Sequence, residues 1–139
     1  MNIEEYHTII RRFCEQERFN ADQLLREGIL TLDGRRVALH FEPDISADHI
    51  LVRAELGPLP ENVQVGCFRS MLKANYEWGF DGAVLSLHPE TEEAVLTARI
   101  PVNASTTAVE LRGALDMLAG ILRHWTATLE DLDHLVSAL

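Results

Sequence analysis

Hydrophobic residues in the segment 61–78 fall on two separate faces of one predicted helix when successive residues are placed about 100° apart. A surface helix that packs on a single core normally carries one apolar stripe, roughly 100° wide. The second stripe therefore predicts a second contact surface, formed with another chain. Alternatively, the helix is central and is buried on both sides within one domain. The stripes are Val63, Cys67, Met71, Ala74 and Trp78, and Val65, Phe68, Leu72 and Tyr76, with Gln64 and Asn75 between them.

Apolar residues at helical spacing also predict a helix at each end of the chain. The first covers residues 2–18, where Asn2 and Glu5 have the spacing of a capping box. The last covers 106 to about 126, with leucines repeating every three or four residues. Such a repeat is found in coiled coils, but over so few heptads it favours a helix packed on a sheet. The tail 128–139 either extends this helix or forms a separate one.

Alternation with a period of two predicts the strands, which lie at 29–32, 35–42, 49–56, 82–88 and 93–100. Asp33-Gly34, between the first two, is typical of a tight hairpin turn. The fold class is therefore α+β, in the order helix-strand-strand-strand-helix-strand-strand-helix, with a twisted antiparallel sheet and flanking helices. Leu51, Val84 and Val95 fall on the nominally polar face of this sheet. That face is covered by a helix or binds a partner.

Length and composition predict a single globular domain, residues 1–139, with 47% hydrophobic residues. No apolar run approaches the roughly 20 residues of a membrane helix. The first residues, MNIEEYHTII, contain no basic segment, so we expect no signal peptide. Cys14 and Cys67 lie in separate amphipathic patterns, which favours buried thiols in a reducing compartment. We therefore expect a cytoplasmic protein.

The charge balance narrows the range of partners. With 22 acidic and 12 basic side chains the formal net charge is −10. Affinity for nucleic acid depends on neutralising phosphates, so this sign argues against DNA, RNA and anionic membrane surfaces as partners. An acidic surface favours solubility and attracts basic partners.

Candidate catalytic or metal-binding groups are sparse. The six histidines are dispersed, without a pair at metal-ligand spacing. Nucleophile-elbow, P-loop and dinucleotide-binding glycine motifs are missing from the sequence. Cys67 lies on an apolar helix stripe, where a filler of the core or of an interface is expected rather than a nucleophile. We therefore expect no enzyme activity, no metal and no cofactor, and predict a protein-binding role.

Three motifs resemble the class I chaperones of bacterial type III secretion, the Tir-chaperone-like (CesT-like) family. LDGRRVALHFEP is similar to the family's first strand pair, and LVRAELGPLPE is similar to its strand end and break. MLKANYEWGFDGAVLSLHPETEEAVLTARIPV is similar to its central helix and second hairpin. The similarity covers about residues 30 to 130. Residues that carry it are Ala54, Leu56, Gly57, Leu59, Pro60, Leu72, Ala74, Asn75, Gly82, Leu85, Leu87, Leu96, Arg99 and Pro101.

The resemblance implies a cytoplasmic bacterial homodimer, joined chiefly through the central helix, that binds the amino-terminal segment of an effector and keeps it soluble for secretion. A secretion ATPase or a regulator is a further implied partner. We expect the second subunit to contact Val63, Cys67, Met71, Ala74 and Trp78, with Phe68 and Leu72 pointing inward. The effector is expected to contact Leu51, Val84, Val95, Ile10 and Phe13.

Two other hypotheses remain open. The same fold can serve as a regulatory or stand-alone interaction domain, which binds a transcriptional regulator or another protein. An enzyme or small-ligand binder would require a closed pocket with converging carboxylates or histidines.

Overall fold

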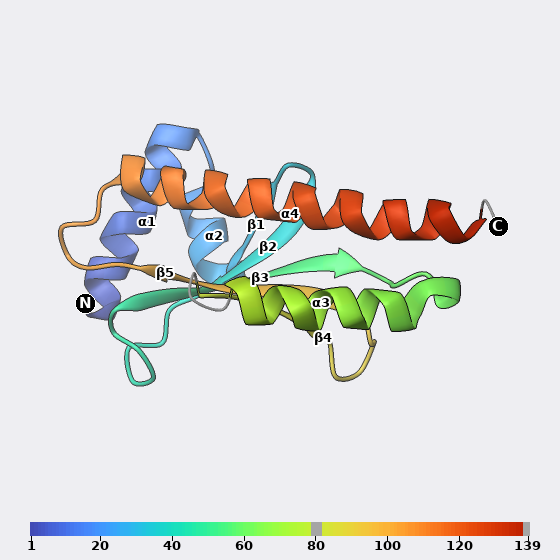
Figure 1. The fold of residues 1–139 in the computed structure, drawn as a ribbon. Coiled ribbons are helices and arrows are strands. Elements are labelled where there is room, and N and C mark those ends of the chain that lie inside the picture. The colour runs from blue at the N-terminus through green and yellow to red at the C-terminus, as the bar shows by residue number, and fades with distance from the viewer. Residues whose placement is uncertain (79–81, 138–139) are drawn as a thin grey trace.

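The computed structural model describes residues 1–78 and 82–137, with side chains described for 1–77 and 82–132. Within these ranges the strands form one antiparallel sheet with the order β1-β2-β3-β5-β4 (Figure 1). The predicted α+β class and the element order are confirmed. The strands are β1 (Ile29–Leu32), β2 (Arg35–His40), β3 (His49–Gly57), β4 (Ala83–Leu87) and β5 (Ala94–Pro101).

Local sequence explains the first hairpin. Asp33 and Gly34 both have positive φ angles, 51° and 75°, as a two-residue turn between twisted strands requires. Leu32 then pairs with Arg35, which sets the register of β1 and β2. The last hairpin is β4–β5, and it is placed so that β5 pairs with β3 while β4 forms the edge.

Alternation along β3 separates the two faces of the sheet. Ile50, Val52 and Ala54 are fully buried in the core. Leu51 and Arg53, which alternate with them, lie on the opposite side, and we call this side the outer face. The central strands therefore have one face that is buried in the core and one face that is accessible to solvent.

Three helices cover or flank the core: α1 (Ile3–Glu17), α2 (Ala21–Glu27) and α4 (Ala108–Ser137). Asn2 and Glu5 form the predicted capping box, in which the Asn2 side chain accepts a hydrogen bond from the Glu5 N–H at 2.8 Å. Figure 1 shows α4 running along the sheet on the same side as α1. The tail continues α4 without a break to Ser137, which confirms the first of the two alternatives for this segment.

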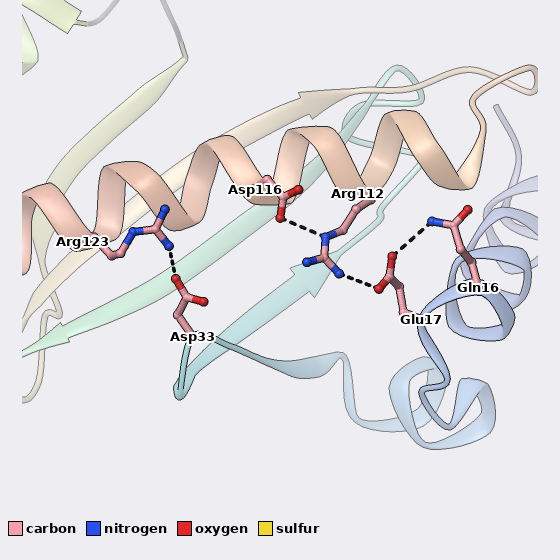
Figure 2. Close-up of polar contacts among 6 residues, drawn as sticks. All are labelled: Gln16, Glu17, Asp33, Arg112, Asp116 and Arg123. Atoms are coloured by element: carbon pink, nitrogen blue, oxygen red, sulfur yellow. Dashed lines mark hydrogen bonds and ion pairs between the residues drawn. The ribbon is translucent and has the colours of Figure 1, made fainter.

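Apolar and polar contacts together place α4. Its leucines from Leu111 to Leu129 face the core, and Leu111, Leu115 and Leu122 are at most 2% exposed. On its solvent side Arg112 pairs with Glu17 of α1, and Arg123 pairs with Asp33 of the first hairpin (Figure 2). Exposed ion pairs of this kind contribute roughly 0–1 kcal/mol each, so the buried leucines account for most of the energy that holds the helix in place.

The central helix lies beside the edge of the sheet. A single 3-10 turn, η1 (Glu61–Val63), leads into α3 (Gln64–Trp78), which packs against β4. The Asn75 side-chain amide donates to the Leu85 carbonyl at 2.9 Å and accepts from the Leu85 N–H at 2.8 Å. These two backbone groups belong to an edge strand and face away from β5, so the amide of Asn75 takes the place of a missing strand at that position. Gly79, the expected end of the helix, lies outside the described residues.

Candidate functional site

One face of α3 is apolar and exposed. Val65 is 71% exposed, Leu72 69% and Tyr76 86%, and Phe68 is partly covered at 36%. We call these four residues the α3 outer stripe. Large hydrophobic side chains so exposed on one contiguous helix face mark an interaction surface rather than scattered surface residues. The prediction that α3 has one face in its own core and a second apolar face outside it is confirmed, and burial on both sides is excluded for these residues.

The assignment of the two stripes was wrong. The stripe expected to face a second subunit is buried in the chain's own core, with Val63 at 6%, Cys67 at 0% and Met71 at 4% exposure, and Ala74 is half-buried. Phe68 and Leu72, expected to point inward, are both exposed, at 36% and 69%. The side chain of Trp78, the fifth member, lies outside the described residues.

The anchor at Asn75 explains this orientation. On a helical projection Asn75 lies at the boundary between the two stripes. Its two hydrogen bonds to Leu85 orient that boundary towards β4, so one stripe turns inward and the other turns to solvent. Cys67 and Ala74 are small enough to let the helix approach the core closely, and the bulkier outer stripe is left outside.

The outer face of the sheet supports only part of the predicted effector surface. Leu51 is half-buried and Val84 is 45% exposed, so both can contact a partner. Val95 is only 8% exposed, which contradicts its expected role. Its cross-strand neighbours are Glu55 of β3 and Ser86 of β4, and these side chains flank it on the same face.

The predicted effector contacts on α1 are also wrong. Ile10 is 0% exposed and Phe13 is 1% exposed. Both belong to the one apolar stripe of α1, and from Tyr6 onward this stripe packs in the core, where α1 meets α2 and α4. An amphipathic helix with a single apolar face has nothing left on that face for a partner.

A hollow of about 470 Å³ lies on the outer face, where β2, β3 and β5 meet the loop after β2. Its floor is Leu51, which lies opposite His40 of β2 and Arg99 of β5. Arg53 is the next outer-face residue along β3. Strand alternation predicts from the sequence that Leu51 and Arg53 share one face of β3. The position of Arg99 next to Leu51 follows only from the pairing of β3 with β5.

Two titratable groups of α1 are buried in the core and have raised pKa values. Burial raises the pKa of the Tyr6 hydroxyl to about 12, and burial also raises the pKa of the Cys14 thiol. A thiol with a raised pKa is a poor nucleophile at neutral pH. Among the described residues, no group of three or more His, Cys, Asp or Glu side chains could hold a metal ion. None of the described helices has the apolar length that a bilayer crossing requires.

Several solved structures share this fold. A chain of the crystal structure of the ExsC–ExsE complex matches with a TM-score of 0.72 and 20% identity, covering 93% of this chain and 97% of that one. A chain of the HopA1–SchA chaperone–effector complex matches with a TM-score of 0.64 and 16% identity, over 91% and 98% of the two chains. A chain of the heterodimeric ExoU–SpcU complex of the Pseudomonas aeruginosa type III secretion system matches with a TM-score of 0.53 and 19% identity, over 75% and 84%.

Sequence then identifies the family. Residues 8–126 match the Tir chaperone protein (CesT) family, so the chain belongs to that family, as its motifs predicted. A comparison with curated protein sequences finds no match.

Proposed function

We propose that this protein is a homodimeric chaperone of type III secretion, which binds the amino-terminal segment of an effector and keeps it soluble and competent for secretion, without catalysis. Membership of the chaperone family supports the general role. The observation that carries the homodimer is the α3 outer stripe, since Val65, Leu72 and Tyr76 are each at least 69% exposed in the single chain. Burying apolar surface releases roughly 25 cal/mol per Å², so exposure on this scale favours a covering partner.

A second copy of the chain is the occupant proposed for this stripe. Most soluble homo-oligomers are two-fold symmetric, and in such dimers the same patch contacts itself. A helix with one exposed apolar stripe is suited to this arrangement, because α3 of one protomer can lie against α3 of its partner. The dimer would leave the outer face of each sheet available for cargo.

Cargo is proposed to bind as an extended segment across the sheet. Leu51 and Val84 offer apolar contacts on the outer face, and β1 is an edge strand that can pair with an added strand. A disordered segment loses conformational entropy on binding, so it needs a large contact area to bind stably. A surface spread over the strands of the sheet supplies such an area better than a closed pocket does.

Affinity capture from a bacterium that encodes this chain tests the proposal. The wild-type protein is expected to retain a secreted effector, and to lose it when the amino-terminal segment of the effector is deleted. Leu51→Asp on the outer face should weaken capture, while Thr8→Asp, an exposed change on α1, should leave capture unchanged. Capture of a transcriptional regulator in place of an effector would favour the regulatory alternative, and capture of no partner that depends on Leu51 would contradict the proposed cargo surface.

A further inference from the structure

The hollow on the outer face has a cationic side. Arg53 and Arg99 both line it and both are exposed. Leu51 lies between them, as the cross-strand neighbour of Arg99 and two residues before Arg53 on the same face of β3. Directly opposed residues in a sheet have Cβ atoms about 5 Å apart, so Arg99 lies beside Leu51 across the strands, and Arg53 follows Leu51 on the same face of β3.

These guanidinium groups are available to a ligand. Neither Arg53 nor Arg99 forms an ion pair with a carboxylate in the described part of the chain. By contrast, Arg112 and Arg123 on α4 each face an acidic side chain. Glu42, in the loop after β2, is the acidic residue that lines the hollow, so its two arginines outnumber its carboxylates.

The local charge is opposite to that of the whole molecule. The chain has a formal net charge of −10, and this average favours basic partners over long distances. At contact distance the two arginines dominate instead, because screening at physiological salt limits charge effects to about 8 Å. An acidic segment that meets the sheet at this point gains a favourable contact that the surrounding surface does not offer.

We propose that the hollow binds an aspartate or glutamate of the cargo segment, next to an apolar cargo residue that packs on Leu51. This inference rests on the proposed function, and it specifies the chemistry of the cargo at one point of the surface. An arginine guanidinium binds a carboxylate through two parallel hydrogen bonds, and such charge-assisted bonds are about twice as strong as neutral ones. The volume of about 470 Å³ is within the range of known ligand sites, roughly 300–1,000 Å³.

Two fluorescently labelled extended peptides test this proposal against the full-length protein. One alternates leucine and glutamate, and the matched peptide alternates leucine and lysine. The glutamate peptide is expected to bind wild-type protein about tenfold more tightly than the lysine peptide, as one charge-assisted hydrogen bond would produce. The double variant Arg53→Glu/Arg99→Glu should abolish or reverse this preference.

Matched variants separate the hollow from general electrostatics. Arg12→Glu, which changes an exposed arginine on α1, is expected to leave the preference within about twofold. Arg53→Gln/Arg99→Gln removes the charges without adding acids and should reduce the preference while the circular dichroism spectrum stays native. A preference that survives both double variants, or no binding of the glutamate peptide, would overturn the proposal.

Competition and cargo capture complete the test. Inorganic phosphate in excess should not displace the glutamate peptide, because the apolar contact with Leu51 contributes to binding, and complete displacement would identify a small-anion site instead. Cargo capture by the Arg53→Glu/Arg99→Glu protein distinguishes a failure of the proposed acidic contact from a failure of the proposed chaperone function. If this variant captures the cargo as well as wild type does, the acidic contact is refuted while the chaperone function stands.

Discussion

Met71 and Leu72 are neighbours in the chain and lie in opposite environments. Met71 is 4% exposed and packs in the core, whereas Leu72 is 69% exposed on the α3 outer stripe. Met71 has an unbranched side chain and Leu72 is branched at Cγ. Both are hydrophobic and have good helix propensity, so neither property predicts which of them is buried. Their difference comes only from the rotation of α3 about its own axis.

A glutamate at each position tests this rotation. Met71→Glu places a charge in the core and is expected to cost at least about 3 kcal/mol of unfolding free energy. Leu72→Glu should keep native helix content and lose only the part of the stability that depends on protein concentration. Urea unfolding followed by circular dichroism at several concentrations measures both, with Lys73→Glu as the exposed control. Equal loss of helix content in the two variants would contradict the orientation of α3.

At the scale of elements, one side chain joins α3 to the sheet. Asn75 satisfies both backbone groups of Leu85 on the edge strand β4. An edge strand with free backbone groups is exposed to unwanted pairing, and a side-chain amide that mimics a backbone unit protects that position.

Replacing this amide by an acid should weaken the junction. Asn75→Asp keeps the shape but loses the donor, so a carboxylate oxygen would face the Leu85 carbonyl. We expect a loss of roughly 1–3 kcal/mol in unfolding free energy, the range for a buried hydrogen-bonding group left without its partner. Gln64→Glu, the same chemical change at an exposed position of α3, should have little effect. Equal unfolding midpoints for the two variants would show that Asn75 does not anchor the helix.

The elements could be predicted from the sequence because their signals are local. The capping box of Asn2 and Glu5 and the turn at Asp33-Gly34 act within a few residues, and both have the expected geometry. The inward stripe of α3 was not predictable in this way. It depends on contacts between Asn75 and a strand that follows in the chain, and the two stripes are similar in hydrophobicity.

The same reasoning explains the errors in the candidate site. The sequence shows that Ile10 and Phe13 lie on an apolar helix face, but it does not show what that face contacts. Only the packing of α1 with α2 and α4 shows that both residues are buried in the core. Arg99 lies beside Leu51 because β5, rather than β4, pairs with β3. Strand order in a sheet is a long-range property, so periodicity within each strand does not reveal it.

At the scale of the whole molecule, the two proposed binding surfaces lie apart from each other. The α3 outer stripe lies beyond the β4 edge of the sheet, and the hollow with Arg53 and Arg99 lies on the outer face of the central strands. A net charge of −10 opposes non-specific association. The proposed dimer therefore requires a specific apolar contact strong enough to exceed this repulsion, and the exposed stripe is the surface proposed to supply it.

The mass of the protein in solution tests this central claim most directly. Sedimentation equilibrium of the wild-type protein is expected to give twice the chain mass of 15.6 kDa. Leu72→Glu/Tyr76→Glu should give the single chain mass with a native circular dichroism spectrum, because these exposed residues lie outside the core, and Lys73→Glu should remain a dimer. A wild-type protein that stays at 15.6 kDa across the concentration range, or a dimer unaffected by the double change, would contradict the account.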